Sequence, residues 1–423
     1  MQYQEEEIKR GIEFHKINTD KFKTNLVAVF LTTELTRENV TKNALISTIL
    51  RRGSKNMPSQ EEISKQMEEM YGASFDCGLD KIGDNQVLKF YMETINDDFI
   101  PQQRENMLKI TLEKLLEIVF NPYIENGEFK KEYIEQEKNN IKQKIEGKID
   151  NKARYALNRC IEEMYKNQPY GLYKFGYVED LDAIDGKNLY EYYQKLIKDC
   201  KIDILVSGIL PDTIEQIIQE NENIKNLKER EPKYVMPKLT DKNINTSENI
   251  VTESMEVTQG KLVLGLDIKL EDEKQKYDAL LYNSILGGTA NSKMFQNVRE
   301  KAHLAYVASS SYIRQKNNIF INCGIEISNY EKALEIVRKQ IDDMKKGDFT
   351  EEDIENAKKG IISTIDLIDD EQDTGITYYF GQELSNNKIS PEEYKEIIQK
   401  VRKEDIVRIA NSVSINTIYF LKD

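Results

Sequence analysis

The chain has 423 residues, and its 74 acidic side chains outnumber its 60 Lys and Arg residues, which leaves a formal net charge of −14. This acidic balance argues against nucleic acid as a partner, because phosphate binding needs a basic surface. The only histidines, His15 and His303, lie far apart, so one chain cannot supply a three-histidine metal site or two histidines on one helix. The longest apolar runs are strand-sized, which argues against a membrane span.

Cysteine usage and the first residues both predict a cytoplasmic protein. The stretch MQYQEEEIKR lacks the basic start and apolar core of a secretory signal. Four cysteines are widely scattered without a C-x-x-C pair, and we expect reduced, packed thiols at Cys77, Cys160, Cys200 and Cys323.

The first half of the chain reads as strands followed by helices. His15 lies in an apparent strand, GIEFHKINT, and is expected to be an ordinary, partly exposed side chain. Two stretches with sustained 3.6-residue periodicity and many Glu/Lys pairs predict exposed amphipathic helices at Gln102–Phe120 and Lys130–Lys148. The other predicted elements are a strand at 26–31, helices ending near 55 and 75, a strand at 87–95 and a closing strand at 201–209.

A polar segment that carries Pro232 and Pro237 then separates the chain into two parts. Its composition predicts an inter-domain linker. The predicted organisation is an N-terminal half at 1–220, a linker at 221–250 and a C-terminal half at 251–423.

The second half repeats the pattern of the first. It has a strand at 262–267, a helix at 279–293, a helix ending near Ala302–His303, strands after it, and a closing strand at 416–423. Similar residues recur at matching places: Leu26 and Leu262, Leu50 and Leu286, Tyr71 and Tyr306, Phe129 and Phe349, Asp150 and Asp370. We interpret this as a duplication, and the order of elements predicts an α+β protein with mixed or antiparallel sheets.

One motif in the second half is long and specific: residues 287–306 read GGTANSKMFQNVREKAHLAY. It resembles the G-G-x…S-x-L-F…R-E-K-x-G-L-A-Y element of the insulinase-like (pitrilysin-type) zinc metallopeptidases, and the layout of nearly the whole chain is similar to theirs. The resemblance implies a metalloenzyme (LuxS/peptidase)-like fold, in which two duplicated α/β-roll halves have largely antiparallel sheets flanked by helices.

The first half departs from this family at the zinc motif. Residues 50–54, LRRGS, align with the family phrase L-F-K-G-T, which places Ala44, Ser47 and Thr48 on H-x-x-E-H. Lys144 aligns with the third zinc ligand, a Glu. Ala, Thr and Lys cannot replace imidazole or carboxylate ligands. The chain therefore resembles the non-catalytic subunit of two-component members, with no metal of its own.

The resemblance implies a heterodimer in which a zinc-binding insulinase-like subunit supplies the metal and this chain closes a chamber over a peptide substrate. The family residues that match Arg299 and Tyr306 reach the zinc site in trans. A Tyr hydroxyl can donate to a developing oxyanion, and Arg offers a rigid fork to a peptide carbonyl. Without the resemblance, the spacing of Arg299 and Tyr306 is equally consistent with an ordinary Arg at a helix end and a half-buried Tyr. The same resemblance is compatible with a homodimer when the chain is isolated. It implies no binding to nucleic acid or to a membrane.

Three further features have ordinary interpretations. His303 lies where the family usually has Gly, which predicts a left-handed residue at a helix end. Residues 287–289 (GGT) lack the G-K-[ST] ending of a phosphate loop, so a helix C-cap and turn is favoured. Glu137 matches a chamber Glu of the family and, without the metal, is expected to be solvated or salt-bridged.

Two alternatives remain open. Some family relatives are core subunits without a peptidase role, and the chain would then be a structural scaffold. A metal-free enzyme that works with carboxylates is the other alternative, although most Asp and Glu side chains are simply solvated. Metal content and peptidase activity, with and without a partner, would separate these possibilities.

Overall fold

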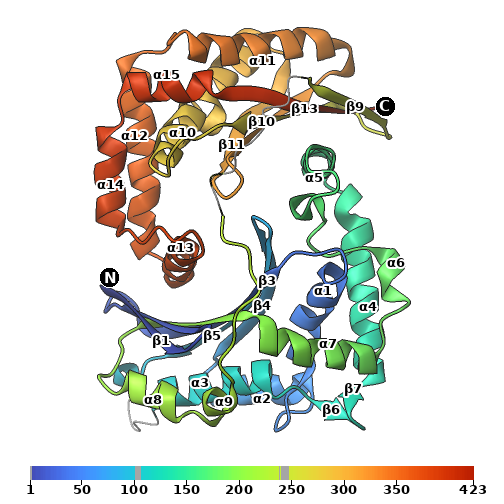
Figure 1. Ribbon diagram of the computed structural model, residues 1–423, viewed down its shortest axis with the longest axis vertical. Helices are drawn as coiled ribbons and strands as arrows, with labels where there is room; N and C mark the ends of the chain where they lie inside the picture. The colour runs from blue at the N-terminus through green and yellow to red at the C-terminus, as the bar shows by residue number, and fades with distance from the viewer. Residues whose placement is uncertain (1, 101–105, 238, 240–246) are drawn as a thin grey trace. The chain divides into compact units, whose positions relative to one another are not determined.

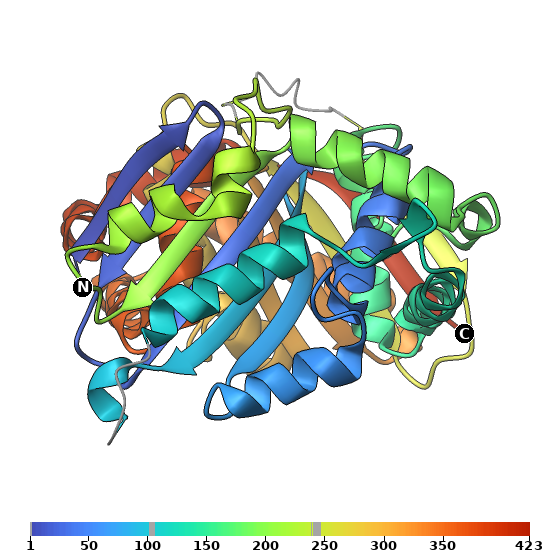
Figure 2. The same cartoon turned by 90° about the horizontal axis from the view of Figure 1, so that it is seen from below.

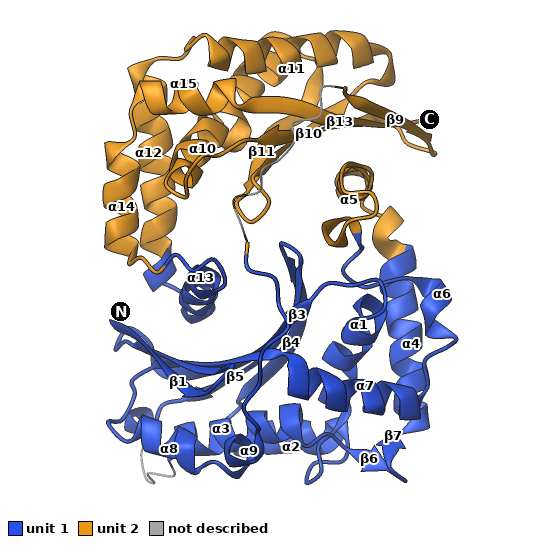
Figure 3. Cartoon of the chain, viewed as in Figure 1, with its two compact units in different colours: residues 1–146, 172–236, 368–387 blue, residues 147–171, 237–367, 388–423 orange. Residues whose placement is uncertain are grey.

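The computed structural model describes residues 2–100, 106–237, 239 and 247–423. Residues 102–105 of the predicted first long helix, and 238 and 240–246 of the predicted linker, lie outside the described residues. The chain forms two compact units, coloured separately in Figure 3. Unit 1 contains residues 1–146, 172–236 and 368–387, and unit 2 contains residues 147–171, 237–367 and 388–423.

Unit 1 is built on a six-stranded sheet with the order β1-β2-β8-β3-β5-β4. Every neighbouring pair is antiparallel except β2 and β8, which are parallel. The predicted strands at 26–31, 87–95 and 201–209 are confirmed as β3, β5 and β8. The bounds are β1 (Gln2–Lys9), β2 (Ile12–Asn18), β3 (Thr24–Glu34), β4 (Ser74–Ile82), β5 (Asn85–Ile95) and β8 (Lys201–Gly208).

A layer of helices covers one face of this sheet, as Figure 2 shows, and we call this face the outer face. Val27, Val29 and Leu31 of β3 are buried against it, because side chains alternate between the two faces of a strand. The bounds are α1 (Val40–Ile49), η1 (Leu50–Arg52), α2 (Gln60–Glu69), η2 (Asp97–Phe99), α3 (Met107–Phe120), α4 (Lys131–Glu146), α6 (Val178–Leu181), α7 (Gly186–Asp199), α8 (Ile214–Glu220) and α9 (Glu222–Asn226), with a small hairpin of β6 (Ile124–Glu125) and β7 (Glu128–Phe129).

The opposite face of the same sheet is covered by α13 (Gln372–Leu384), which comes from the second half of the chain. Leu26, Ala28 and Phe30 point to this face and form an apolar cluster with Ile376 and Phe380 of α13. The rings of Phe30 and Phe380 meet edge to face at 4.7 Å. Strand β8 is therefore buried on both faces along its whole length.

Unit 2 has a five-stranded sheet with the order β11-β12-β10-β13-β9. All pairs are antiparallel except β9 and β13. On one face, Val263 and Tyr419 pack against Ala156 and Cys160 of α5 (Lys152–Met164), a helix from the first half of the chain. The strands are β9 (Asn249–Ser254), β10 (Gly260–Ile268), β11 (Ala305–Ile313), β12 (Asn318–Ile325) and β13 (Val413–Lys422).

The remaining helices of unit 2 include two π-helical segments, η5 (Ser284–Gly288) and η6 (Phe295–Lys301). Figure 1 shows α11 and α15 on one side of the sheet and α5 on the other. The bounds are α10 (Gln275–Asn283), α11 (Tyr330–Lys345), α12 (Glu351–Asp366), α14 (Pro391–Lys400) and α15 (Lys403–Asn411), with short 3-10 turns η3 (Gly147–Ile149), η4 (Pro169–Gly171), η7 (Ile327–Asn329) and η8 (Leu367–Asp369).

The two sheets share one topology. Strands β2-β8-β3-β5-β4 of unit 1 correspond to β9-β13-β10-β12-β11 of unit 2, including the single parallel pair in each. Helices α5 and α13 also occupy matching positions in the order of elements. The 16-residue helix α4 precedes α5, and the 16-residue helix α12 precedes α13. The predicted duplicated α+β fold with largely antiparallel sheets is confirmed. Each half gives one helix to the sheet formed by the other half.

Candidate functional site

The predicted Arg/Tyr element lies where η6 passes into the edge strand β11. Arg299 is on η6, its guanidinium 4.5 Å from the ring centre of Phe295, and its side chain is 42% exposed. Its Nε lies 3.4 Å from an oxygen of Glu300. Stacking on Phe295 restricts the long side chain without covering it, so the guanidinium remains accessible.

His303 ends η6, as the sequence predicted. Its φ of 52° is left-handed, and the N–H of Leu304 returns to the carbonyl of Val298 at 3.1 Å. The predicted helix end near Ala302–His303 is therefore confirmed. This reversal directs the chain straight into β11.

Tyr306 stands out on β11 because a β-bulge places it there. Ala305 pairs with Ile325 and Val307 pairs with Gly324, which leaves Tyr306 as the extra residue. Its side chain is 75% exposed, the largest value among the exposed apolar and aromatic side chains of the described chain. Bulges commonly re-aim a side chain at the end of a sheet edge. Both Arg299 and Tyr306 are thus presented to solvent on neighbouring elements.

The predicted helix C-cap and turn at residues 287–289 is confirmed, with both glycines in the last turn of the helix. Gly287 and Gly288 are the last residues of η5, and Thr289 follows as the C-cap. A Cβ on Gly287 would lie 2.6 Å from Ser310 Oγ and 2.7 Å from Ser310 N. Gly287 therefore lets η5 approach β11 closely. The extra residue of a π-helical turn cannot be seen in a 3.6-residue pattern.

In unit 1, the positions aligned with the zinc motif lie on α1 and α4. Ala44, Ser47 and Thr48 are buried on α1. The hydroxyl of Ser47 donates to the carbonyl of Ala44 at 2.8 Å, and that of Thr48 donates to Leu45 at 3.1 Å, so both are used within the helix itself. Lys144 on α4 is exposed, with its ammonium 5.5 Å from the ring centre of Phe175.

Glu137 is 3% exposed and salt-bridged, one of the two states expected for it. Its Oε1 accepts a hydrogen bond from Arg52 Nε at 2.5 Å and one from Asn140 Nδ2 at 3.2 Å. Sequence reasoning did not identify Arg52 as this partner, because the two residues are 85 positions apart.

Among the described residues, no group of three or more His, Cys, Asp and Glu side chains could hold a metal ion. The residues present here do not fit zinc.

His15 is fully buried, so its predicted partial exposure is wrong. Its Nε2 donates to Asp203 Oδ1 at 3.0 Å, and its Nδ1 lies 2.8 Å from the hydroxyl of Tyr3. Lys201 completes the cluster through Asp203 and lies 3.8 Å from Glu383 of α13. The side chain is buried because α13, from the second half of the chain, covers this face of the sheet, and because the ring of Tyr3 on the neighbouring strand β1 stacks beside the His15 ring.

Comparison with known proteins is consistent with this geometry. Residues 183–361 match the model of the Peptidase M16 inactive domain. The chain is 34% identical over 418 residues to the probable inactive metalloprotease YmfF of Bacillus subtilis (strain 168), covering 97% of this chain and 96% of that protein. It belongs to the M16 peptidase family. The predicted membership in the insulinase-like (pitrilysin-type) family is confirmed.

Solved structures support the fold of this M16 chain. A conserved protein from Enterococcus faecalis V583 is 27% identical, with a TM-score of 0.91 over 100% of this chain and 99% of that one. The peptidase M16 inactive domain from Pseudomonas fluorescens is 16% identical, with a TM-score of 0.80 over 100% and 98% of the two chains. The chain is accordingly an inactive M16-family metalloprotease-like protein. No helix in the described part of the chain is long and apolar enough to cross a membrane.

Proposed function

We propose that this protein is the catalytically silent subunit of a heterodimeric M16 zinc peptidase. A zinc-binding M16 subunit supplies the metal, and this chain helps to close the peptide chamber. Arg299 and Tyr306 act on the substrate at the partner's site. The observation that carries the proposal is the exposure of both side chains, Arg299 at a helix end and Tyr306 on a bulge. In the same chain, the positions aligned with the zinc motif on α1 and α4 are Ala44, Ser47, Thr48 and Lys144.

The chemistry of the two side chains suits this role. The hydroxyl of Tyr306 can donate to the oxyanion that develops on the scissile carbonyl. The guanidinium of Arg299, which lies over the ring of Phe295, can donate to a peptide carbonyl without losing its charge. A substrate that binds in extended form along a sheet edge is held through its backbone, so affinity needs little sequence selection. The four free cysteines agree with a reducing compartment such as the cytoplasm.

The test is reconstitution of peptidase activity with an M16 subunit that has an intact H-x-x-E-H motif. Neither chain alone should cleave a quenched fluorescent peptide, and the mixture should. Arg299→Ala or Tyr306→Phe should lower kcat/KM about 100-fold, the scale of losing one oxyanion-hole donor. Matched controls are Arg408→Ala, whose side chain is 54% exposed, and Tyr123→Phe, which is half-buried in unit 1.

Four results would contradict the proposal. Unchanged rates in both variants would remove the active-site role, and a stable complex that never hydrolyses peptide would favour the scaffold alternative. Peptidase activity of the purified chain alone, or stoichiometric zinc bound to it, would show an autonomous enzyme. Metal content is measured on the isolated chain by mass spectrometry, so it does not depend on the partner.

A further inference from the structure

Strand β9 ends the sheet of unit 2, and no strand in the described part of the chain pairs with its outer edge. One contact identifies the backbone groups at this edge. The N–H of Met255 donates to the carbonyl of Lys422 on β13 at 2.8 Å, so the odd-numbered residues of β9 bond to β13. The N–H and C=O groups of Ile250, Thr252 and Ser254 therefore point to the free edge.

The duplicated fold shows what this edge lacks. Strand β9 corresponds to β2 of unit 1, and β1 covers the outer edge of β2 through an antiparallel ladder. As an edge strand, β1 carries Glu5, Glu6, Glu7 and Lys9, and its ladder has a register shift after Glu7. Charged side chains and irregular pairing both discourage a further strand. Among the residues that the structure describes, unit 2 has no counterpart of β1, so its sheet stops one strand earlier.

Strand β9 has none of these protections. Its six residues, Asn249–Ser254, include neither Lys nor Pro, and they pair with β13 without a register shift. The one charged side chain, Glu253, accepts hydrogen bonds from Tyr155 at 2.6 Å and Arg159 at 3.1 Å on the α5 face of the sheet. Ile250 lies on the opposite face and is 58% exposed. A regular edge with an exposed apolar side chain is a template for another strand.

A second copy of this chain fits the edge for two reasons. Two chains that each carry a net charge of −14 repel each other, so they can meet only where charge is absent or neutralised. Strand β9 is such a place, because Arg159 neutralises Glu253 and Arg338 binds Glu248 just before the strand.

The second reason is that the edge is complementary to itself. A two-fold axis through Thr252 pairs Thr252 with its own copy and Ile250 with Ser254 of the other chain. All the outward-facing residues of β9 then exchange hydrogen bonds, about six in total, in an antiparallel ladder.

We propose that two copies of this chain associate through β9, in an antiparallel pair centred on Thr252. The sheet of unit 2 then continues from one copy into the other. Strand β9 contains neither Arg299 nor Tyr306, so this association goes beyond the proposed function and can be tested without it. When a zinc-binding partner is present, the assembly is a pair of heterodimers.

Sedimentation velocity on the purified full chain, over a range of concentrations, tests the association. One strand pair buries less surface than a standard interface, so we expect a reversible dimer with a dissociation constant in the micromolar range or weaker. Raising the ionic strength should tighten it, because salt screens the repulsion between two acidic chains. In hydrogen exchange, the amides of Ile250, Thr252 and Ser254 should become more protected as the concentration rises.

Two substitutions address the edge itself. Thr252→Pro removes an N–H that β13 does not use, so the monomer should fold while the dimer weakens about tenfold or more. Thr252→Val keeps this N–H and is the matched control. Ile250→Lys should weaken the dimer by placing a charge on the edge. Its control is Ile149→Lys, the same change at a position that is 38% exposed.

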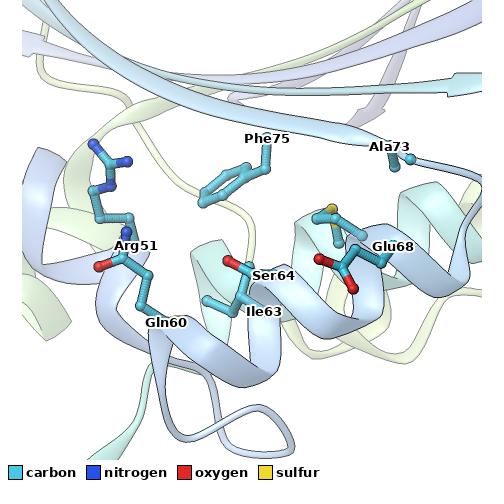
Figure 4. Close-up of a pocket in the computed structure, with 9 residues that line it drawn as sticks. Arg51, Gln60, Ile63, Ser64, Glu68, Ala73 and Phe75 are labelled. Atoms are coloured by element: carbon cyan, nitrogen blue, oxygen red, sulfur yellow. The ribbon is translucent and has the colours of Figure 1, made fainter.

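Two further variants locate the interface. In the proposed pair the Cα atoms of the two Thr252 residues are about 5.5 Å apart, so Thr252→Cys should form a disulfide-linked dimer on oxidation. Cys77→Ser is included as background because that thiol is only partly buried. Ser64→Trp fills the pocket between α2 and β4, beside the free edge of unit 1, and should leave the dimer unchanged (Figure 4).

Four results would overturn the association through β9. They are a monomer at every concentration, a dimer that survives both Thr252→Pro and Ile250→Lys, a dimer that Ser64→Trp weakens, and a dimer in which Thr252→Cys forms no disulfide. Amide protection of β9 that does not change with concentration would show that the chain covers its own edge, which also contradicts it. Loss of reconstituted peptidase activity in Arg299→Ala has no bearing on any of these readouts.

Discussion

Asp203 offers a sharp test of how unit 1 is held together. Its buried carboxylate on β8 accepts hydrogen bonds from His15, at 3.0 Å, and from Lys201. Lys201 is itself 3% exposed and also lies 3.8 Å from Glu383 on α13. Burial alone raises the pKa of Asp203, but Lys201 and His15 outweigh it and hold that pKa below its ordinary value of 3.8.

Asp203→Asn keeps the shape of the side chain and removes its charge. Breaking a buried ion pair from one side typically costs about 3–5 kcal/mol, because the remaining charge has no compensation. Since Lys201 keeps Glu383 as a second partner, we expect a loss at the lower end, about 3 kcal/mol in the free energy of unfolding. The double variant Asp203→Asn/Lys201→Met should lose clearly less than the sum of the two single variants.

Urea unfolding followed by circular dichroism measures these losses, and hydrogen exchange of β8 and α13 assigns them to unit 1. Lys198→Met, at an exposed position of α7, is the matched surface control. Strict additivity of Asp203→Asn and Lys201→Met, or a loss no larger than that of the control, would refute the idea of one coupled network.

The dependence on pH has a definite sign. Because the folded pKa of Asp203 is lowered, its contribution is complete above pH 3.8 and is lost as the pH falls through the folded value. The pKa of Lys201 is raised above 10.5, since Asp203 outweighs the effect of burial, so its contribution is lost only as the pH rises past that range. The stability gap between wild type and Asp203→Asn should be constant at neutral pH and should narrow in acid.

Three shorter predictions concern other contacts. Gly287→Ala should lower both the melting temperature and the reconstituted activity, because its Cβ would lie 2.6 Å from Ser310 Oγ; thermal melts and peptidase assays check this. Glu137→Gln should cost about 1–3 kcal/mol in urea unfolding, since Arg52 loses its charged partner, and adding Arg52→Gln should recover part of it. Glu253→Gln should cost about 1–2 kcal/mol by the same assay and loosen α5, because the carboxylate accepts hydrogen bonds from two tyrosines and an arginine.

Much of the fold could be predicted from periodicity. The short apolar runs that begin at Leu26 and Leu262 identified the central strands of both sheets, and their recurrence identified the duplication. The sequence did not predict which helices pack on each sheet. An amphipathic helix such as α5 shows that it has an apolar face, but its sequence does not say which sheet receives that face. His15 illustrates the consequence, because its burial depends on α13, which lies more than half the chain away.

The candidate site, like the fold, could be predicted only in part from the sequence. Arg299 and Tyr306 were found from a motif, and so was the left-handed residue His303. The bulge that exposes Tyr306 is a one-residue insertion in a strand pair, and it leaves no mark in the alternation of one strand. The Arg52–Glu137 pair joins residues that are adjacent only after folding. Patterns along the chain report local periodicity, whereas these features arise from pairing between distant segments.

The exchange of α5 and α13 has a consequence for biosynthesis. The chain passes between the units five times, after Glu146, Gly171, Met236, Leu367 and Asn387. Gln372 of α13 donates to the carbonyl of Ser207 at 3.1 Å, so unit 1 lacks part of its core until nearly the whole chain has left the ribosome. A nascent chain that stops at the end of the first half leaves Leu26, Ala28 and Phe30 without the cover that α13 provides. For the same reason, halves expressed from separate genes would reach the native state only by exchanging these helices, and a protease cut in the segment after Met236 would leave the pieces interlocked.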